Sequence, residues 1–320
     1  MQTKKIAIAS FWPLDANSTE RLRAAAPGYE LLDLSTDPSD AELAQCEILF
    51  GNVNMETLRK MTALKWVHMQ TAGVDWYADP KIGVPEDILL TNSSGAYGIS
   101  IAEHMLTVTF MMLRRAAGYV LQQQEHKWAN LGSAKNLYDC NVTVVGMGDI
   151  GGRYAMLCHA MGAKVTGVVR TARAEKPEYV KELFTTDGLV AAVKDADIVA
   201  LAMPGTSETA GLLSQDILSK MKQGAKIVNV GRGSAIDQDA LADLLQSGHL
   251  GGAALDVTTP EPLPADNPLW DMPDVIITPH VSYGGRDITF ELIFEKFLRY
   301  LADYKAGRPF ERVVNRKAGY

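Results

Sequence analysis

Short apolar runs alternate with amphipathic, helix-like stretches over the first hundred residues. The apolar runs predict β-strands at residues 5–10, 29–33, 47–50 and 66–69, and the helical spacing between them predicts helices at 18–26 and 55–61. Alternation of this kind indicates βαβ units, in which helices cover a parallel sheet. The first part of the chain is therefore expected to be an α/β domain.

A second alternating series starts at residue 141. Buried strands are predicted there and at residues 164–169, 198–203, 226–230, 252–257 and 275–278. One long helix is predicted over residues 100–124, between the two series, and a last helix over 287–306 is expected to return the chain to the first domain. We therefore predict two α/β domains. Residues 1–99 with 286–320 form one of them, and residues 100–285 form the other.

The second series opens with the glycine pattern Gly146-x-Gly148-x-x-Gly151, after an apolar run and before a helix-like stretch. A strand that turns tightly into a helix presents backbone N–H groups and the positive helix end to a pyrophosphate. Gly146 would permit the turn, Gly148 would let the phosphates approach, and Gly151 would let the helix pack on its strand. The pattern predicts a dinucleotide site, with an ordinary glycine-rich loop as the alternative.

Two arginines change the expected cofactor. An Asp or Glu normally follows the second strand of such a unit and binds the adenosine ribose, but residues 168–173 contain no carboxylate. Arg170 and Arg173 stand there instead, and guanidinium groups suit a 2′-phosphate. We therefore predict that NADP(H) is preferred and that NAD(H) can also bind. In the alternative interpretation, both arginines are solvated surface residues.

Three further side chains each follow a separate predicted strand: Arg232, Glu261 and His280. A guanidinium at the carboxyl edge of a parallel sheet can bind a carboxylate and polarise a neighbouring carbonyl. A histidine held by a carboxylate has a fixed tautomer and can donate a proton near neutral pH. Taken alone, Arg232 could be a loop anchor and His280 a structural histidine, and His104 is a minor rival for the acid/base role. Together they indicate reduction of a keto group.

Composition excludes several classes of function. The chain has 320 residues, and its formal net charge of −7 with scattered Lys and Arg gives no footprint for nucleic acid. Cys46, Cys140 and Cys158 lack the spacing of a metal cluster or a disulfide framework, which suits buried thiols in a reducing compartment. No apolar stretch has the length of a secretion signal or a membrane span. We expect a cytoplasmic protein with no metal and no nucleic-acid or membrane partner.

The sequence resembles the D-isomer-specific 2-hydroxyacid dehydrogenase family, which includes glyoxylate/hydroxypyruvate reductases, D-lactate dehydrogenases and phosphoglycerate dehydrogenases. The resemblance covers nearly the whole chain. Besides the glycine pattern, it is carried by Lys65-Trp-Val-His-Met-Gln-Thr-Ala-Gly-Val-Asp75, Ala102-Glu-His104, Asn229-Val-Gly-Arg-Gly-Ser234, Ala254-Leu-Asp-Val257 and Thr278-Pro-His280. It implies two Rossmann-like, doubly wound parallel-sheet domains separated by an interdomain cleft. The first, flavodoxin-like domain would bind the substrate, and the second would bind the dinucleotide.

The resemblance also implies roles for single residues. Arg232 would orient the 2-oxo acid, His280 would be the acid/base, and Glu261 would be the partner of His280. The backbone N–H groups at Ala72, Gly73 and Val74 would hold the substrate carboxylate. Besides the three glycines and two arginines above, the implied cofactor contacts are Asp149, Ile150, Thr171, Met203, Pro204, Thr209, Val230, Gly231, Arg232, Asp256, His280 and Ser282.

We therefore predict an oxidoreductase that reduces small 2-oxo acids to D-2-hydroxy acids with NADPH, reversibly, and that forms a homodimer. The usual acidic residue of the family is Val169 here, followed by Arg170, as in NADP-preferring members. Residues 129–136 depart from the family in a region that helps to form its dimer. The alternatives are an NAD-preferring dehydrogenase, a cofactor-sensing binding protein, and a formate dehydrogenase, against which Glu261 argues.

The sequence does not identify the 2-oxo acid. Five aromatic residues could line the substrate pocket and favour a bulky or aromatic substituent, or could equally belong to the core or an interface. They are Trp76, Tyr77, Tyr97, Trp128 and Tyr283.

Overall fold

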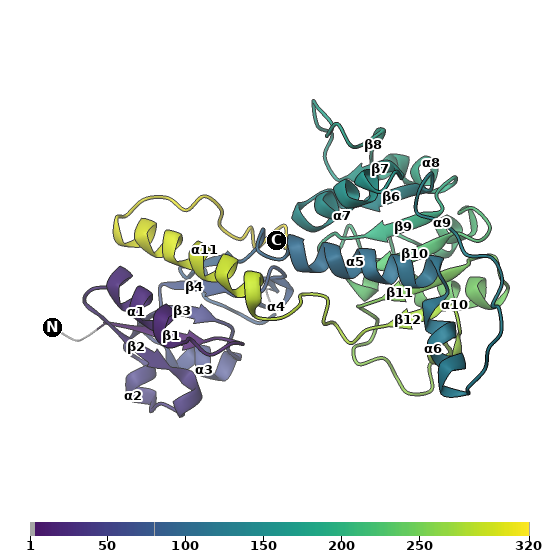
Figure 1. Cartoon of the computed structure of the whole chain (residues 1–320). Coiled ribbons are helices and arrows are strands. Elements are labelled where there is room, and N and C mark those ends of the chain that lie inside the picture. The colour runs from purple at the N-terminus through teal and green to yellow at the C-terminus, as the bar shows by residue number, and fades with distance from the viewer. Residues whose placement is uncertain (1–3, 80, 320) are drawn as a thin grey trace. The chain divides into compact units, whose positions relative to one another are not determined.

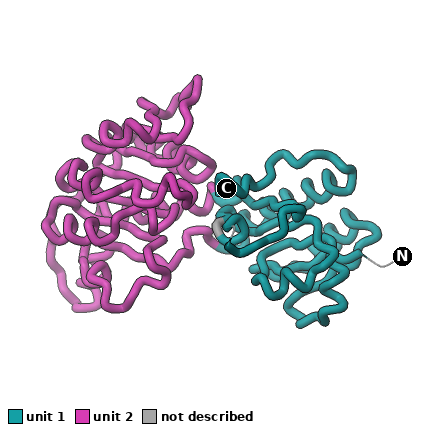
Figure 2. The backbone as a smooth tube through the Cα atoms, turned by 180° about the vertical axis from the view of Figure 1, so that it is seen from behind, with its two compact units in different colours: residues 1–97, 285–320 teal, residues 98–284 magenta. Residues whose placement is uncertain are grey.

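The computed structural model describes residues 4–79 and 81–319. The chain divides into two compact units, which Figure 2 shows in different colours. Unit 1 consists of residues 1–97 and 285–320, and unit 2 consists of residues 98–284. Each unit is built on its own parallel sheet, so the predicted α/β fold with two such sheets is confirmed.

The sheet of unit 1 has five strands in the order β2-β1-β3-β4-β5, all parallel. This is the flavodoxin-like order, in which the chain starts inside the sheet and winds outward in both directions. The strands are β1 (Lys4–Ala9), β2 (Tyr29–Asp33), β3 (Cys46–Gly51), β4 (Trp66–Met69) and β5 (Leu89–Asn92). The helices are α1 (Ala16–Ala25), α2 (Asp40–Leu43), α3 (Met55–Lys60), α4 (Asp75–Ala78) and α11 (Asp287–Lys305), with a 3-10 turn η1 (Leu34–Thr36).

Both faces of this sheet are apolar because helices cover both of them. Leu49 and Val67 belong to a core cluster that includes side chains from α2, α3 and α4. Their neighbours along the same strands point the other way, as the pleat requires. On that second face Phe50 stacks on Phe297 of α11, with ring centroids 4.3 Å apart. In Figure 1, α11 runs along this sheet, which explains why the C-terminal segment belongs to unit 1.

The sheet of unit 2 has seven parallel strands in the order β12-β11-β10-β9-β6-β7-β8. Counted from β6, this is the dinucleotide-binding order 3-2-1-4-5-6 with one further strand. The strands are β6 (Asn141–Val145), β7 (Lys164–Val169), β8 (Glu182–Thr185), β9 (Ile198–Leu201), β10 (Lys226–Asn229), β11 (Gly252–Leu255) and β12 (Val275–Ile277). The order reverses beside β6, and ligands of such sheets bind outside the carboxyl ends of the strands at that point.

Helices cover both faces of this sheet as well. The core on one face includes side chains from α8 (Leu189–Val193), α9 (Gln215–Ser219) and α10 (Gln238–Gln246). On the other face α5 (Gly98–Leu113) packs against α7 (Asp149–Ala160), where the hydroxyls of Thr109 and Tyr154 lie 2.8 Å apart. The remaining elements of unit 2 are α6 (Ala116–Gln124) and the 3-10 turns η2 (Thr186–Gly188), η3 (Gly233–Ala235) and η4 (Pro268–Asp271).

The prediction of one helix over residues 100–124 is wrong. The segment forms α5 and α6, which are separated at Arg115, whose backbone is left-handed with φ of 55°. The guanidinium of Arg115 donates a hydrogen bond to the Leu131 carbonyl, 2.5 Å away. Residue 131 is distant in sequence, so apolar periodicity gave no signal for this break. The predicted strands also missed β5, although most of its residues are buried, and the edge strand β8, whose residues are mostly half-buried.

Candidate active site

The three glycines of the turn between β6 and α7 differ in their surroundings. Gly146 has φ of 95°, a left-handed conformation that favours glycine. A Cβ at Gly151 would lie 2.0 Å from the Gly146 carbonyl oxygen, whereas a Cβ at Gly148 would meet nothing within 4 Å. Gly151 therefore allows the close packing of α7, and Gly148 leaves open space at the N-terminus of that helix. This geometry fits a pyrophosphate.

Asp149 and Ile150 form the first turn of α7. The Asp149 carboxylate is turned toward the protein: its Oδ1 accepts a hydrogen bond of 3.1 Å from Arg153 Nε, and its Oδ2 is buried without a hydrogen-bond partner among the described residues. A Cβ at Gly98 would lie within 2.5 Å of this carboxylate, so a larger residue there would displace the Asp149 side chain. The backbone at Asp149 and Ile150, and not these side-chain contacts, belongs to the predicted phosphate site.

The two arginines that follow β7 lie at the same edge of the sheet as the glycine turn. Arg173 Nη2 donates a hydrogen bond of 3.1 Å to the Met147 carbonyl, within the turn itself. Arg170 Nη1 lies 3.9 Å from Glu208 Oε2, and both of these side chains are exposed. Thr171 between them is exposed as well. Two guanidinium groups beside the turn suit the 2′-phosphate of an NADP molecule, because each can donate charge-assisted hydrogen bonds to it.

The loops after β9 and β10 are in close contact with each other. A Cβ at Gly231 would lie 2.7 Å from the Met203 carbonyl oxygen. Thr209 closes the β9 loop by donating a hydrogen bond of 2.8 Å to the Pro204 carbonyl, and Val230 is buried. Since β9 is next to β6 and β10 is next to β9, the loops after these parallel strands extend the candidate cofactor site along the carboxyl edge of the sheet.

His280 and Glu261 form the central pair of the candidate site. His280 Nδ1 lies 2.9 Å from Glu261 Oε2, and about half of each side chain is exposed. The other carboxylate oxygen of Glu261 accepts a hydrogen bond of 3.2 Å from the Thr258 backbone N–H. The imidazole is therefore oriented by a carboxylate that is itself held by a loop, which leaves the second ring nitrogen for chemistry.

A buried carboxylate shapes the backbone at His280. Asp256 follows β11, and its carboxylate accepts hydrogen bonds from the Thr278 hydroxyl (2.6 Å) and from the N–H groups of Val281 (2.9 Å) and Ser282 (3.1 Å). Burial raises the pKa of Asp256, but the hydrogen bonds from Ser282, Thr278 and Val281 outweigh it, so that the pKa lies below its usual value. His280 sits inside this arrangement with a left-handed φ of 54°.

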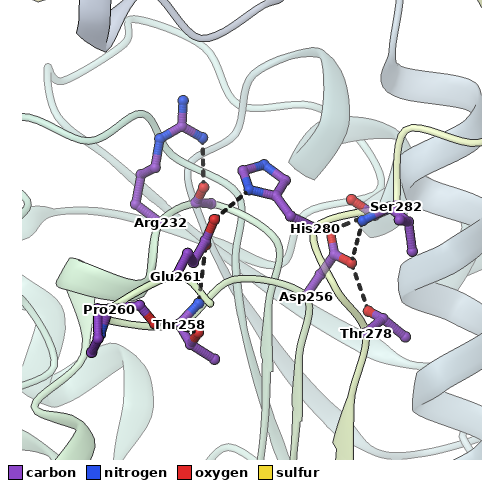
Figure 3. A network of polar contacts seen from close by, with 10 residues as sticks. Arg232, Asp256, Thr258, Pro260, Glu261, Thr278, His280 and Ser282 are labelled. Carbon is purple, nitrogen blue, oxygen red and sulfur yellow. Dashed lines mark hydrogen bonds and ion pairs between the residues drawn. The ribbon is translucent and has the colours of Figure 1, made fainter. Parts of the chain in front are cut away.

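Arg232 follows β10 and lies next to the Glu261 loop. Its Nη1 donates a hydrogen bond of 2.8 Å to the Gly231 carbonyl, and its own carbonyl accepts one of 2.9 Å from Asn229 Nδ2. A Cβ at Gly233 would lie 2.1 Å from the Thr258 backbone, so the two loops touch. Figure 3 shows the Glu261 side chain between those of Arg232 and His280. The structure thus brings together the three predicted catalytic residues.

The predicted substrate loop lies in unit 1, directly after β4. The Ala72 carbonyl accepts a hydrogen bond of 2.6 Å from Asn92 Nδ2, and the Gly73 carbonyl accepts one of 2.7 Å from the Thr71 hydroxyl. Val74 is buried and anchors the start of α4. The carbonyls of Ala72 and Gly73 are thus hydrogen-bonded within unit 1, and the assignment of the loop's N–H groups to a ligand carboxylate stays a prediction.

The aromatic candidates separate into two groups. Tyr77 and Tyr97 are buried and belong to the packing of unit 1, whereas Trp76, Trp128 and Tyr283 are exposed. His104, the rival acid/base, lies with Nε2 3.4 Å from the Thr278 hydroxyl. Thr278 and Thr258 are supporting residues that sequence reasoning missed; their positions beside strand ends were the available signal.

The part of the chain that the structure describes contains neither a candidate metal site nor a membrane-spanning helix. Among residues 4–79 and 81–319, no group of three or more His, Cys, Asp and Glu side chains is arranged to hold a metal ion. No helix in this part of the chain is long and apolar enough to cross a membrane.

Comparison with known proteins relates this site to one family. Residues 106–282 match the model of the D-isomer specific 2-hydroxyacid dehydrogenase NAD binding domain. D-3-phosphoglycerate dehydrogenase of Bacillus subtilis is 34% identical over 82% of this chain, which spans 49% of that protein. A D-isomer specific 2-hydroxyacid dehydrogenase from Xanthobacter autotrophicus in complex with NADPH superposes with a TM-score of 0.84 at 26% identity, covering 99% of this chain and 100% of the other.

An NADPH-dependent glyoxylate/hydroxypyruvate reductase from Sinorhizobium meliloti, in complex with NADP and sulfate, also has a TM-score of 0.84. Its identity is 28%, and the match covers 99% of this chain and 100% of that one. The family model covers more than half of the chain, and it lies within unit 2. The protein therefore belongs to the D-isomer specific 2-hydroxyacid dehydrogenase family and is an NAD(P)-dependent enzyme of that family.

Proposed function

We propose that the protein reduces small 2-oxo acids to D-2-hydroxy acids with NADPH, and that the reaction is reversible. The observation that carries this proposal is the His280–Glu261 pair, with 2.9 Å between Nδ1 and Oε2, beside Arg232 at the carboxyl edge of the sheet. Reduction of a ketone needs a hydride at carbon and a proton at oxygen. The bound nicotinamide supplies the hydride.

His280 supplies the proton. Glu261 accepts a hydrogen bond from the Nδ1–H group and stabilises the imidazolium, so Nε2 is the nitrogen that donates a proton to the carbonyl oxygen. After donation the ring is neutral, and its Nδ1–H group still donates the hydrogen bond to Glu261. In the reverse direction, the same nitrogen would take the hydroxyl proton, and the hydride would pass from carbon to the oxidised nicotinamide.

Arg232 and the loop 72–74 hold the substrate in this proposal. The Arg232 guanidinium can bind the 2-oxo acid and polarise its carbonyl, an electrostatic role typically worth roughly 3 kcal/mol of barrier. The backbone N–H groups at Ala72, Gly73 and Val74 would bind the carboxylate. The substrate would then be fixed by charge and hydrogen bonds at one end only, which leaves its C3 substituent to decide specificity.

The preference for NADP(H) is supported by Arg170 and Arg173 at the end of β7. Arg173 is hydrogen-bonded to the glycine turn, and no acidic residue occupies positions 168–173. The Xanthobacter and Sinorhizobium structures, at 26% and 28% identity, were solved with NADPH and NADP. An NAD-preferring enzyme is the alternative, and it predicts a higher kcat/KM with NADH.

We also propose that the enzyme is a cytoplasmic homodimer. The segment from α6 to residue 138 exposes apolar side chains: Val120 and Leu121 are each 54% exposed and Trp128 is fully exposed. Several exposed apolar side chains in one segment favour association. Replacement of Trp128 by Lys should lower the molar mass measured by light scattering to that of a monomer.

The three cysteines are unpaired and buried, as expected for a reducing compartment.

The decisive experiment is steady-state reduction of glyoxylate, hydroxypyruvate, pyruvate and phenylpyruvate with NADPH and NADH in parallel. His280→Ala should lower kcat by a factor of about 10²–10⁴. His159→Ala is the matched control, because His159 is an exposed histidine in the last turn of α7 and should leave kcat unchanged. Normal turnover by His280→Ala would remove His280 from the mechanism. Binding of NADPH without consumption of any 2-oxo acid would instead indicate a cofactor-sensing protein.

A further inference from the structure

The loop after β1 is tied to the loop that leads into the substrate segment. Gln70, directly after β4, accepts a hydrogen bond of 2.8 Å from the Phe11 backbone N–H and donates one of 2.6 Å to the Ser10 hydroxyl. Its own N–H donates to Asn52 Oδ1, 3.2 Å away, after β3. One amide side chain thus connects two loops at the carboxyl edge of the unit 1 sheet, and the position of Phe11 is fixed relative to residues 72–74.

The ring of Phe11 is exposed although its backbone is held. Its exposed fraction is 56%, and the Ser10 hydroxyl further closes the turn by donating to the Trp12 carbonyl. When a ligand covers a phenyl ring, burial of the apolar surface lowers the free energy of the complex. Because the backbone is already ordered, little conformational entropy is lost. Phe11 is therefore suited to contact an apolar group.

A second exposed aromatic side chain follows the substrate segment. Trp76 lies in α4, two residues after Val74, and is 41% exposed. Its ring packs edge-on against Tyr77, with centroids 4.9 Å apart, and the Tyr77 hydroxyl accepts a hydrogen bond from the Val53 N–H. The exposed rings of Phe11 and Trp76 therefore lie on the two segments that neighbour the loop 72–74.

Spacing and charge restrict what these rings can contact. In the sheet, β3 lies between β1 and β4, so the loops after β1 and β4 are about 10 Å apart, two strand spacings. A 2-oxo acid whose carboxylate is held at residues 72–74 can bring a substituent to Phe11 only if that substituent is larger than hydrogen. Residues 10–15, 52–54 and 70–79 contain no Lys or Arg, and the guanidinium of Arg286, which reaches residue 15 from another segment, is paired with the Asp15 carboxylate at 2.9 Å. These segments therefore do not favour a phosphorylated or second acidic group.

We propose that Phe11 is a specificity-determining residue that contacts the C3 substituent of the 2-oxo acid. The substrates that follow from this contact carry a branched aliphatic or aromatic substituent, as in 4-methyl-2-oxopentanoate and phenylpyruvate. Glyoxylate, hydroxypyruvate and phosphorylated 2-oxo acids are poorer substrates. This inference rests on the proposed reductase function and on the assignment of loop 72–74 to the carboxylate.

The test measures kcat/KM with NADPH for phenylpyruvate, 4-methyl-2-oxopentanoate, glyoxylate and hydroxypyruvate. The first two should exceed the last two by about tenfold or more in the unmodified enzyme, a typical discrimination for apolar contacts. Phe11→Ala should lower the phenylpyruvate-to-glyoxylate ratio of kcat/KM by about tenfold, and Phe11→Leu should restore the ratio for 4-methyl-2-oxopentanoate. Leu89→Ala is the control: Leu89 is 42% exposed and starts β5, at the opposite edge of the same sheet, so the ratio should not change.

The outcomes separate this inference from the function on which it rests. An unchanged ratio in Phe11→Ala, or a higher kcat/KM for glyoxylate in the unmodified enzyme, would overturn the role of Phe11 while leaving the reductase intact. Failure to consume any of the four acids with either NADPH or NADH would overturn the reductase proposal, and the inference with it.

Discussion

The Thr278 hydroxyl donates a hydrogen bond of 2.6 Å to the carboxylate of Asp256, and through it supports the backbone at His280. The same carboxylate holds the N–H groups of Val281 and Ser282, and the His280 N–H lies 2.9 Å from the carbonyls of both Asp256 and Thr278. A non-glycine residue adopts a left-handed φ at an energetic cost, so such a conformation persists when its surroundings determine it. Thr278 and Asp256 therefore position His280 for its contact with Glu261.

Replacement of Thr278 should test this relationship. Thr278→Val keeps the shape of the side chain but leaves a buried carboxylate without one of its donors, so we expect kcat to fall by about tenfold while KM changes less. Thr278→Ser keeps the hydroxyl and should restore kcat. Equal losses in both variants, or a fall in kcat explained by partial unfolding in circular dichroism, would argue against a positioning role.

Gly148 and Gly151 should respond differently to alanine. At Gly151 the new Cβ meets the Gly146 carbonyl, so Gly151→Ala should lower the free energy of unfolding by about 1–3 kcal/mol. At Gly148 the new Cβ enters open space and φ is −85°, so stability should stay within about 0.5 kcal/mol. Gly148→Ala should instead weaken NADPH binding, because the added methyl occupies the proposed phosphate site. Urea unfolding and fluorescence titration measure the two effects, and unchanged NADPH affinity in Gly148→Ala would contradict that placement.

The arginines after β7 should control the choice of cofactor. In the double variant Arg170→Gln/Arg173→Gln, the Kd of NADPH should rise by about tenfold or more, which is about 1.4 kcal/mol, while the Kd of NADH should change little. Lys181→Gln is a suitable control because Lys181 is exposed on the far side of the same connection and pairs with Glu182. Parallel changes for NADPH and NADH would show that the arginines do not read the 2′-phosphate.

His68 should make the stability of unit 1 depend on pH. Burial, with a further contribution from the charge of Lys296, lowers the pKa of His68 to about 3 from an ordinary value of 6.5. Between these pH values the unfolded chain binds a proton that the folded chain does not, so the free energy of unfolding falls as the pH is lowered from 6.5 toward 3. The loss is up to about 1.4 kcal/mol per pH unit.

The variant His68→Gln removes this titration and keeps a polar side chain near Thr91, whose hydroxyl lies 2.7 Å from Nδ1. Urea unfolding between pH 6 and pH 4 should therefore show a shallower pH dependence in the variant than in the unmodified protein. Parallel pH dependences in the two proteins would show that His68 is protonated in the folded state.

Much of the architecture was predictable because the two parallel sheets are buried on both faces. Many of their strands are short apolar runs, such as residues 198–201, and several of the helices between them have clear periodicity. The glycine pattern at 146–151 predicted a tight strand-to-helix turn, in which Gly146 supplies the left-handed φ and Gly151 the room for close packing. The edge strand β8, which is only half-buried, was missed, and no helix was predicted at α10 although its apolar and polar positions separate clearly.

The sequence alone determined which residue types stand at strand ends: glycines at 146–151, arginines at 170 and 173, and Arg232, Glu261 and His280 after three separate strands. It determined this because parallel strands place their carboxyl ends at one edge, whatever the details of packing. Only the tertiary structure decided which of these side chains meet. Segments distant in the chain meet where Gly233 approaches Thr258 and where Thr278 binds the buried carboxylate of Asp256. The left-handed backbone at His280 lies beside the second of these contacts. Contacts of this kind depend on the packing of loops against each other, for which local sequence carries no signal.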